Sequence, residues 1–472
     1  MTNFHQVDDA VWTYVHGDKK IATVIANDHI ISSLENGCIQ QLINASQLPG
    51  LHEITLNPDA HQGYGVPVGT VLSSESHLYM GAVGYDIKCS MSYLMLDLPT
   101  EELKTSKQCR AILDAINKRV GVGLGQDGHV LPHPREIDAV ELMFGGMIPI
   151  IARDLGIPEH WSEKCEDASH GAPGLGEHIE KRMKDMGTAK VRQLGSLGAG
   201  NHFCEVGVCR VQEGQEDLAD DWGLRDGCLG VLTHCGSRGL GHALASKWFK
   251  ELKAKFKEWG IPFIKGDKEL VYLPAGSREG QEYLRDLAMA GNFTTVNHMV
   301  INKLVLDAFQ EVFPGTRGEL VYFISHNFVR KETCRDGVQR WIHRKGATRA
   351  LPGGHPDLAG GPWADTGHPI LLPGHAISGS SIMAAHRGSE VSQFSVNHGA
   401  GRVFGRAKAK RTLDQATVDQ EFRDKEIIHN HRQFPLDEAC AAYKDYEQVL
   451  DSVKTALLAE EVAKLEARLL LK

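Results

Sequence analysis

Short runs of apolar residues bounded by glycine recur along the chain and predict β-strands that end in loops. These runs occupy residues 66–72, 91–96, 228–233 and 320–325. Apolar positions spaced three and four residues apart predict α-helices over residues 101–119, 281–313 and 436 to about 458. Because strands and helices do not alternate regularly, the pattern predicts an α+β fold, with mixed β-sheets and peripheral helices.

No Pro/Ser-rich linker interrupts the chain, and no segment repeats with a period of about 20–50 residues. We therefore expect residues 1–472 to form a single large domain. Two polar stretches, residues 155–190 and 257–280, are typical of surface insertions, and no chemistry is assigned to them.

Composition narrows the class of protein further. The chain has 472 residues, 60 acidic against 51 basic, and a net charge of −9, which argues against a general coat for nucleic acid. A hydrophobic content of 42% is too high for a disordered chain, and no apolar run reaches the roughly 18 residues of a membrane span. The N-terminal residues lack the features of a secretory signal, so we expect a cytoplasmic protein. Its ten cysteines form no CxxC pair and are expected to stay reduced.

Histidines gather in short blocks that are dense in glycine, asparagine or serine. Nine of the 24 histidines lie in such blocks: His61, His202, His234, His242, His326, His343, His355, His375 and His398. A histidine that ends an apolar strand and enters a glycine turn lies on a loop held by a rigid scaffold, where functional sites tend to be built.

Five residues near predicted strand ends have the chemistry of metal ligands. Asp86 and Cys89 are three residues apart and can converge on one ion if the chain turns there; a turn-forming aspartate beside a buried cysteine is the alternative. His202, His234 and His326 each lie beside an apolar run. Imidazole, thiolate and carboxylate together make a complete coordination shell, and a shared thiolate could bridge two ions, as suits phosphoryl chemistry. Ligand softness by itself favours zinc.

The block NHGAGR at residues 397–402 has the features of a phosphate site. Gly399 and Gly401 let backbone amides approach an anion closely, and Arg402 can pair with phosphate oxygens. Beside such a cradle, His398 can attack phosphorus as a neutral imidazole nucleophile. The alternative is a glycine turn whose histidine serves only as a hydrogen-bond partner.

Two basic runs adjoin these blocks. Residues 330–349 contain seven basic and two acidic residues, and residues 402–411 contain five basic residues and no acidic one. Since the whole chain carries −9 and each run +5, the remainder carries −19. A charge run is usually a solvated face. Beside the loops of a candidate site, these runs predict a confined basic track for a phosphorylated substrate.

Seven blocks of the sequence, taken in order, resemble the RtcB family of RNA ligases. They are LNPDAHQGYGVPVGTVL (56–72), GAVGYDIKCSM (81–91), GSLGAGNHFCEV (195–206), THCGSRGLGH (233–242), SHN (325–327), HRKGATRALPGGHPDL (343–358) and NHGAGRV (397–403). A weaker similarity, AAYKDYEQVL, follows at 441–450. The resemblance implies a single ligase domain whose mixed sheets surround a central cleft for metal and GTP.

The resemblance also implies a chemistry. Members of the family use GTP and two Mn²⁺ ions to join an RNA 3′-phosphate or 2′,3′-cyclic phosphate end to a 5′-hydroxyl end, in RNA repair or tRNA splicing. A histidine of the HGAGR block, here His398, takes GMP from GTP and passes it to the 3′-phosphate, giving an RNA-3′-pp-G intermediate from which the 5′-hydroxyl displaces GMP. The family's metal ligands match Asp86, Cys89, His202, His234 and His326, with Cys89 bridging both ions. Manganese then replaces the zinc inferred from softness, because softness alone is a weak selector.

The family pattern places further residues around the nucleotide and the RNA. Phe203 matches a contact with guanine, and Glu205 is expected to favour guanine because adenine lacks the matching N–H donors. The residues expected to bind GTP are Asn201, His202, Phe203, Cys204, Glu205, His326, Asn327, Pro373, Gly374, His375, Ala376, Ser380, His398, Gly399, Ala400, Gly401, Tyr443 and Lys472. The basic residues expected to bind RNA or phosphate are Arg238, Arg344, Lys345, Arg349 and Arg402.

The chain departs from the family pattern in two places. PGHAISGSS at 373–381 stands where a segment resembling PGxMGTxSY is common, and NHM at 297–299 replaces Asn-Arg-Gln. Neither change touches His398 or the metal-ligand residues, so both bear on RNA choice and GTP contact and indicate a divergent branch. The alternatives are a metal-dependent phosphodiesterase that only opens cyclic phosphates and a non-catalytic RNA-binding paralogue. The resemblance leaves open whether an archease-like activator takes part, and no membrane partner is expected.

Overall fold

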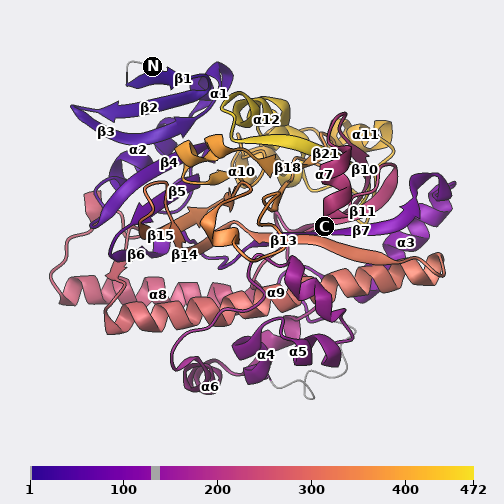
Figure 1. The fold of residues 1–472 in the computed structure, drawn as a ribbon, viewed down its shortest axis with the longest axis horizontal. Helices are drawn as coiled ribbons and strands as arrows, with labels where there is room; N and C mark the ends of the chain where they lie inside the picture. The colour runs from indigo at the N-terminus through magenta and orange to yellow at the C-terminus, as the bar shows by residue number, and fades with distance from the viewer. Residues whose placement is uncertain (1–2, 129–138) are drawn as a thin grey trace.

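A computed structural model describes residues 3–128 and 139–472, and two sheets form its centre (Figure 1). The first sheet has the order β1 (Phe4–Asp8), β2 (Val11–His16), β3 (Lys19–Ile25), β4 (Leu51–His61), β5 (Val68–Ser74), β15 (Gln339–Lys345), β14 (Asn327–Thr333). The second has the order β13 (Gly318–Ser325), β7 (Ser90–Pro99), β11 (Cys228–Cys235), β10 (Phe203–Val211), β21 (Ala459–Leu471), β18 (Ser380–Ala385), β17 (Pro369–Leu372). Within these orders β3 and β4 pair in parallel and the other neighbours pair antiparallel, which confirms the predicted α+β class.

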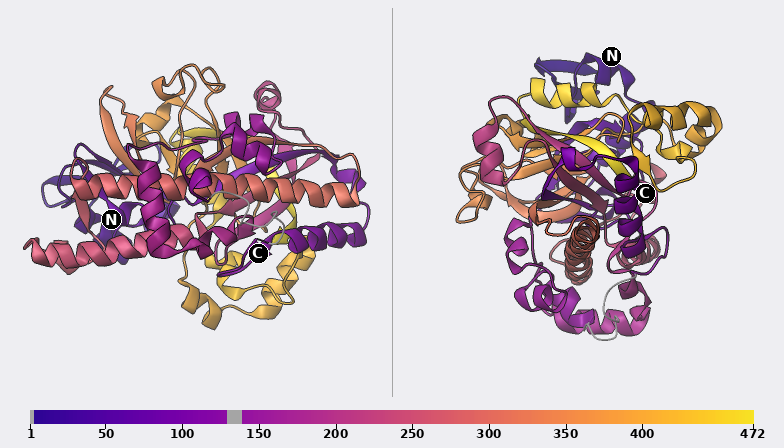
Figure 2. Two further views of the ribbon diagram at one scale, coloured as in Figure 1. Left: turned by 90° about the horizontal axis from the view of Figure 1, so that it is seen from below. Right: turned by 90° about the vertical axis from the view of Figure 1, so that its right-hand side faces the viewer.

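Two long helices, α8 (Arg238–Glu258) and α9 (Arg278–Val312), lie side by side against the sheets (Figure 1). Helix α9 begins where the Ser277 side chain accepts a hydrogen bond from the Gly280 amide at 3.0 Å. Its other side is covered by α4 (Ala139–Gly145) and α6 (Leu175–Met186), so α9 is enclosed between helices and sheets (Figure 2). This enclosure explains why most residues of α9 are buried, polar residues such as Asn292 and Asn297 among them.

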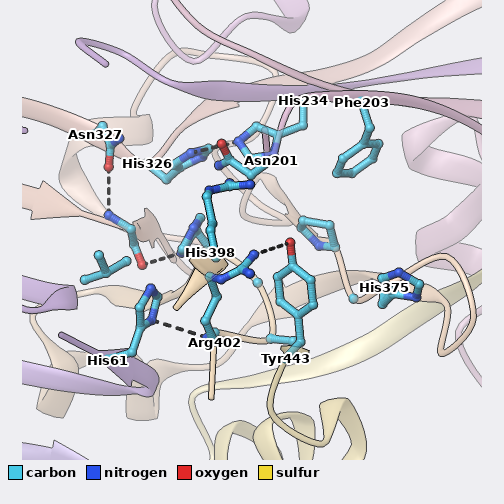
Figure 3. Close-up of a pocket in the computed structure, with 18 of the residues that line it drawn as sticks. His61, Asn201, Phe203, His234, His326, Asn327, His375, His398, Arg402 and Tyr443 are labelled. Atoms are coloured by element: carbon cyan, nitrogen blue, oxygen red, sulfur yellow. Dashed lines mark hydrogen bonds between the residues drawn. The ribbon is translucent and has the colours of Figure 1, made fainter. Parts of the chain in front are cut away.

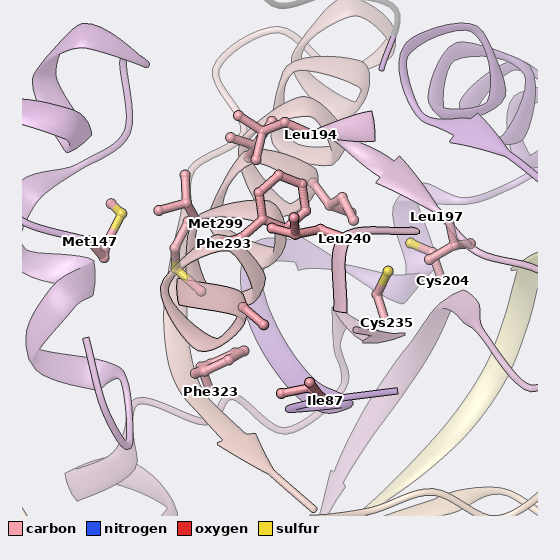
Figure 4. Packing of buried hydrophobic residues seen from close by; sticks show 14 of the residues in the cluster. Ile87, Met147, Leu194, Leu197, Cys204, Cys235, Leu240, Phe293, Met299 and Phe323 are labelled. Carbon is pink, nitrogen blue, oxygen red and sulfur yellow. The ribbon is translucent and has the colours of Figure 1, made fainter. Parts of the chain in front are cut away.

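One hydrophobic core joins these helices to the second sheet (Figure 4). Phe293 and Met299 of α9, Leu240 of α8 and Phe323 of β13 belong to this single buried cluster. Removing each such side chain from water contributes about 1.5–3 kcal/mol to folding. The core thereby fixes the ends of β7, β11 and β13, from which the loops of the site extend.

The four predicted strands all form, as β5, β7, β11 and β13. Of the predicted helices, that over 281–313 forms as α9, and that over 101–119 forms as α3 (Ser106–Arg119) after a short 3-10 turn at Thr100–Glu102. Thr105 sets the start of α3, because its side chain accepts from the Gln108 amide while the Gln108 side chain accepts from the Thr105 amide.

The helix predicted from residue 436 begins ten residues late. Residues Leu436–Glu438 and Cys440–Ala442 form 3-10 turns, and α12 spans only Tyr446–Thr455, after Asp445 caps it. Tyr443 therefore lies outside the helix, where its side chain is free to reach the site.

The sequence pattern does not predict two major elements. Helix α8 starts inside a glycine-rich block, and such a composition is typical of a loop. Strand β21 is rich in alanine, leucine, glutamate and arginine, which are strong helix formers, yet it pairs with β10 on one side and β18 on the other. Tertiary pairing overrides local propensity there.

The two polar stretches contribute to the interior as well as to the surface. In 155–190, Trp161 and Ile179 are fully buried. In 257–280, β12 (Tyr272–Pro274) pairs with β6 (His77–Tyr79), and Val271 is fully buried. Whether either stretch is an insertion stays a prediction.

Across the part of the chain that the structure describes, no helix combines the length and the apolar content needed to cross a membrane. The ten cysteines, all of them in that part, are free thiols.

Candidate active site

A cavity of about 420 Å³ lies where the two sheets meet (Figure 3). Strands β4, β5 and β15 of the first sheet and β10, β11 and β21 of the second all contribute to its lining. The sequence-predicted residues that line it are Asn201, Phe203, Glu205, His234, His326, Asn327, Lys345, Pro373, Gly374, His375, Ala376, His398, Gly399, Ala400, Gly401, Arg402, Tyr443 and Lys472.

His398 lies at the centre of this lining and is held through one ring nitrogen. Its Nδ1 is 2.8 Å from Asp59 Oδ2 and 2.8 Å from the carbonyl oxygen of Gly346. Since both partners are acceptors, Nδ1 carries the proton and donates, and Nε2 keeps its lone pair. Asp59 is fully buried, whereas the His398 side chain remains 15% exposed. Such an imidazole is oriented and ready to act as a nucleophile.

Glycine is required at the position that meets this ring. Gly346 has φ +63°, and a Cβ there would come within 2.9 Å of the His398 ring. Pairing of β16 (Ala347–Arg349) with β19 (Ser395–Asn397) brings the two residues together, because Ala347 lies opposite Asn397.

The residues predicted as metal ligands converge beside His398 because their strands are neighbours. Ser90 of β7 lies opposite Cys235 of β11 and Ser325 of β13, so Cys89, His234 and His326 meet at one edge of the second sheet. The His326 and His398 ring centroids are 4.7 Å apart.

The donor atoms form two overlapping groups that share one thiol. Cys89 Sγ lies 3.4 Å from His202 Nε2 and 3.2 Å from His234 Nε2. His202 Nε2 is 2.9 Å from Asp86 Oδ2, and His234 Nε2 is 3.2 Å from His326 Nε2. In residues 3–128 and 139–472, Cys89, His202 and His234 form the group whose ligand atoms all lie within 4.8 Å of one another. Sulfur, imidazole and carboxylate donors at these separations fit transition-metal ions.

Burial sets the protonation of this cluster. Burial, and next the charge of His326, keeps the pKa of His234 well below its usual value, and burial and His398 do the same for the pKa of His326. Both imidazoles are therefore neutral near pH 7 and can coordinate a metal. Burial, and then the Asp86 carboxylate, raises the pKa of the Cys89 thiol, so metal binding there must release a proton.

One end of the cavity combines an aromatic ring with buried charge. Phe203 and Glu205 face the cavity because alternate residues of a strand share a face, whereas Cys204 between them points into the core shown in Figure 4. Burial raises the pKa of Glu205 to about 7, against the opposing charge of Lys472. Lys472 Nζ lies 5.8 Å from the Phe203 ring centroid. We call this part of the cavity the Phe203 end.

A buried carboxylate, Glu438, organises the Phe203 end. Lys472 Nζ approaches its Oε2 at 2.8 Å, and the Tyr443 hydroxyl donates to Oε2 at 2.6 Å. Arg402 donates to the Tyr443 hydroxyl at 3.0 Å (Figure 3), and Arg406 pairs with Glu438 directly. The cations of this end are therefore held in place around one anion.

The HGAGR block lies tightly against β4. Gly401 has φ +74°, and a Cβ there would meet the Asp59 carbonyl oxygen at 2.1 Å. The Asn397 side-chain amide donates to the Gly399 carbonyl at 2.7 Å, which fixes the loop that follows. Residues 399–401 thus line the cavity in a fixed conformation, and a phosphate cradle there stays a prediction.

The residues that depart from the family pattern have structural partners. His375 Nε2 donates to the Glu438 carbonyl at 2.9 Å, and burial lowers the pKa of His375 to about 4. His298 of α9 contacts Ser92 Oγ at 2.9 Å and the Cys235 carbonyl at 3.0 Å. His375 lines the cavity, whereas residues 297–299 are buried in α9 and reach the site only through the strands beneath it.

Six residues predicted to contact GTP or RNA do not line the cavity: His202, Cys204, Ser380, Arg238, Arg344 and Arg349. Ser380 Oγ accepts from the Gly374 amide at 3.3 Å and so supports the lining loop from behind. Arg238 donates to the Gly123 carbonyl at 2.9 Å and to Ser196 Oγ at 3.1 Å.

The basic run at 330–349 is not an exposed track, which corrects its interpretation from the sequence. Arg344 is 3% exposed and makes a bidentate pair with Glu332 at 2.6 and 2.8 Å. Arg349 is 7% exposed and lies 3.4 Å from the same carboxylate. Lys345 lines the cavity, but its Nζ donates to the Val66 carbonyl at 3.0 Å. Glu332 inside the run neutralises part of its charge, and Glu166 and Asp167, which a local charge count omits, pair with Arg330.

The structure adds residues that sequence reasoning did not assign to the site. The cavity lining also includes His61, Tyr64, Val68, Gly84, Tyr85, Phe249, Gly346, Arg406, Phe434 and Leu470. Asp59 and Glu438 act through hydrogen bonds to His398 and Tyr443. Asp59 lies in one of the seven blocks that resemble the RtcB family, residues 56–72, and this position could have suggested a role at the site. No comparable feature of the sequence points to Glu438.

The fold and the site together define an α+β protein in which a cavity-lining histidine adjoins a buried cluster of metal-ligand type. A sequence model of the family described as "tRNA-splicing ligase RtcB" matches residues 41–472. A protein named tRNA-splicing ligase RtcB from Thermococcus kodakarensis is 32% identical over 98% of both chains, and one from Aeropyrum pernix is 34% identical over 94% of both. A protein named RNA-splicing ligase RtcB from Mycobacterium tuberculosis is 32% identical over 90% of this chain and 98% of its own. The chain belongs to the RtcB family.

Proposed function

We propose that this protein is a GTP- and Mn²⁺-dependent RNA ligase that joins an RNA 3′-phosphate or 2′,3′-cyclic phosphate end to a 5′-hydroxyl end. The observation that carries the proposal is the placement of His398. Its Nδ1 is held by Asp59 and Gly346 at 2.8 Å each, which leaves Nε2 with a lone pair in a cavity that the metal-ligand cluster adjoins. Family membership supports the same activity.

In the proposed reaction His398 Nε2 attacks the α-phosphorus of GTP, so an N–P bond forms and pyrophosphate leaves. At a cyclic end, water first adds to phosphorus and breaks the bond to O2′, which gives a 3′-phosphate. An oxygen of the RNA 3′-phosphate then attacks the phosphorus of the bound GMP, so a P–O bond forms and the N–P bond breaks. The 5′-hydroxyl oxygen finally attacks the RNA 3′-phosphorus, and GMP leaves. Asp59 stabilises the positive charge that the imidazole gains while nitrogen is bonded to phosphorus, because its carboxylate is 2.8 Å from Nδ1.

Other residues bind and orient the two substrates. The backbone amides of residues 399–401, with Asn201 and Asn327, would hold phosphate oxygens, as lining residues of the same cavity. Phe203 would pack on guanine, while Glu205 accepts hydrogen bonds from guanine N–H groups. Lys472 and Tyr443, which Glu438 holds in place, would contribute the remaining contacts at the Phe203 end.

The metal-ligand cluster fits two ions. Asp86, Cys89 and His202 would hold one ion, and Cys89, His234 and His326 would hold the other. Bound Mn²⁺ would neutralise triphosphate charge and polarise the reacting phosphate.

Transfer of GMP to the protein tests the proposal. Incubation with Mn²⁺ and GTP radiolabelled at the α-phosphorus, followed by denaturing electrophoresis, should give an acid-labile, alkali-stable label on the protein. His398→Ala should abolish the label because no other group replaces Nε2. Asp59→Asn should slow labelling by about 10²-fold or more while leaving bound metal unchanged, since it removes only the charge that orients Nδ1.

The exposed histidine His29 provides the matched control, because His29→Ala should label like the wild type. Absence of label on wild-type protein that carries its full metal content would refute the ligase proposal. If that protein still opened 2′,3′-cyclic phosphates, the phosphodiesterase alternative would replace it.

A further inference from the structure

Four aromatic side chains line the cavity but belong to none of the residues assigned to GTP: Tyr64, Tyr85, Phe249 and Phe434. Phe434 is buried and packs against His375, whereas the other three contact one another. Tyr64 and Tyr85 meet edge to face with ring centroids 5.8 Å apart, and Tyr85 packs on Phe249 at 4.6 Å. Phe249 is buried, Tyr85 is half-buried, and Tyr64 is 68% exposed. We call these three residues the aromatic shelf.

The aromatic shelf is built on fixed supports. The Tyr85 hydroxyl donates to Glu269 Oε2 at 3.1 Å, and Lys253 holds the other oxygen of that carboxylate at 2.6 Å. At Tyr64 the backbone carbonyl accepts from Lys345 Nζ. Gly65 follows with φ +70°, and a Cβ there would meet the Glu269 carbonyl oxygen at 3.1 Å. The exposed Tyr64 ring is therefore presented from a constrained turn.

The aromatic shelf and the Phe203 end attach to His398 through different elements. Lys345, which holds Tyr64, precedes Gly346, whose carbonyl contacts His398 Nδ1 and whose amide donates to Asn327 Oδ1 at 2.8 Å. The Phe203 end reaches His398 through Tyr443 and the HGAGR block instead. In Figure 3, Asn327 lies on one side of His398 and Phe203 lies on the other. The two aromatic parts of the cavity lining thus connect to His398 through separate segments of the chain.

A ligase that uses GTP must also position an RNA end at the same histidine. If guanine occupies the Phe203 end, the aromatic shelf offers the exposed ring of Tyr64 to a second base, whereas Phe434 of the lining is buried. Aromatic side chains stack nucleobases of any sequence. Lys345 lies beside the shelf, and burial lowers its pKa to about 7. When protonated it has three N–H donors, of which two bond the Tyr64 and Val66 carbonyls. A further donor there suits a strand that ends in phosphate better than one that ends in an uncharged hydroxyl.

We propose that the aromatic shelf of Tyr64, Tyr85 and Phe249 stacks the terminal nucleobase of the RNA strand that carries the 3′-phosphate. This inference rests on the proposed ligase function and adds a binding site for its RNA substrate. Stacking on Tyr64 reads no base edge, so the site accepts each of the four bases with similar affinity.

Fluorescence of RNA with 2-aminopurine at the 3′-phosphorylated terminal nucleotide tests the shelf, measured without GTP so that no reaction occurs. Wild-type protein should quench the probe. Tyr64→Ala should weaken binding about tenfold and remove most of the quenching, whereas Tyr64→Phe should retain both, because stacking needs the ring and not the hydroxyl. Phe144→Ala is the matched control, since Phe144 is 53% exposed and does not line the cavity.

GTP labelling of the same proteins separates the shelf from the proposed function. Equal RNA affinity and quenching for wild type and Tyr64→Ala, with wild-type labelling intact, would overturn the shelf while leaving the ligase proposal in place. Quenching confined to a probe at the 5′-hydroxyl end would overturn the strand assignment. Loss of GTP labelling in Tyr64→Ala with unchanged RNA affinity would assign the shelf to guanine and also overturn it. Absence of label on metallated wild type would instead refute the ligase proposal.

Discussion

Two hydrogen bonds to one ring nitrogen decide which atom of His398 can react. Asp59 Oδ2 and the Gly346 carbonyl both accept from Nδ1 at 2.8 Å, so Nε2 is the ring nitrogen available for the proposed attack on GTP. The sequence block around His398 indicates a phosphate cradle and leaves the tautomer open. Asp59 is 339 positions away in sequence, so only the folded chain shows that it orients the ring.

Glu205 is the residue whose titration should control nucleotide choice. Burial raises its pKa to about 7, with Lys472 opposing the rise. Below that pH the carboxyl is protonated and loses acceptor capacity, and above it the carboxylate can accept from guanine N–H groups. GTP affinity should therefore rise several-fold between about pH 6 and about pH 8, and Glu205→Gln should bind GTP more weakly with a flatter profile.

Calorimetric titration with GTP across this pH range measures the effect. The exposed Glu213→Gln variant should reproduce the wild-type profile, and ATP should show no comparable pH dependence. The same steep profile in Glu205→Gln would show that another group controls guanine binding.

At the scale of elements, residues 165–170 form a strap beneath the metal-ligand loops. The backbone of Cys165 forms an isolated parallel β-bridge with Phe323 of β13. Glu166 Oε2 accepts hydrogen bonds from the Ser325 amide and hydroxyl at 3.0 and 2.6 Å. Lys88, the residue before Cys89, donates to the Asp167 carbonyl at 3.2 Å and contacts His170 Nε2 at 2.7 Å. A stretch that looks like surface in the sequence therefore supports both strand ends that carry predicted ligands.

Neutralising Glu166 should loosen this strap. The carboxylate is fully buried and lies 2.9 Å from Arg330 and 3.7 Å from Arg349, so Glu166→Gln leaves two buried cations with less compensating charge. We expect the free energy of unfolding to fall by about 3–5 kcal/mol. Denaturant midpoints measure the loss, with the exposed Glu163→Gln of the same segment as the control. Equal midpoints for the two variants would contradict the role of the strap.

At the scale of the whole molecule, the charges that sum to −9 are unevenly distributed. The sequence identifies two basic runs but does not show which of them is exposed. The first basic run is paired internally, as Arg344 with Glu332 shows. The second run provides the exposed cations, because Lys408 and Arg411 lie on the surface of α10 (Arg406–Thr412) next to Arg406 of the cavity lining. RNA should therefore meet positive charge at α10.

Salt dependence of RNA binding tests this placement. The double variant Lys408→Ala, Arg411→Ala should weaken RNA binding and reduce the slope of log K against log salt by about 1–2, since each phosphate contact contributes about 0.7 for a single strand. The exposed pair Lys250→Ala, Lys257→Ala on α8 should leave the slope unchanged. Equal slopes for both double variants would show that α10 does not contact the RNA.

Much of the fold, and which residues gather at the candidate site, could be predicted from the sequence. The strands on or beside which Cys89, His234 and His326 lie were predicted correctly, because each is a short apolar run next to a polar turn. Strand β21 could not be predicted from the sequence, because its composition favours a helix. Its pairing with β10 and β18 holds it in an extended conformation. The helix expected from residue 436 begins late for a related reason: the Asp445 cap and the 3-10 turns before it interrupt an otherwise helical spacing.

The sequence by itself determined which residue types are available for chemistry and which apolar runs carry them, since both follow from composition and short-range spacing. Only the tertiary structure decided what surrounds them. It placed Asp59 against His398, gathered the Lys472 and Tyr443 side chains around Glu438, buried Arg344 and Arg349, and set Tyr64 at the cavity. Burial and charge pairing depend on which residues are close in space, from Tyr443 and Glu438 five positions apart to Asp59 and His398 339 positions apart, and no local pattern records such neighbours.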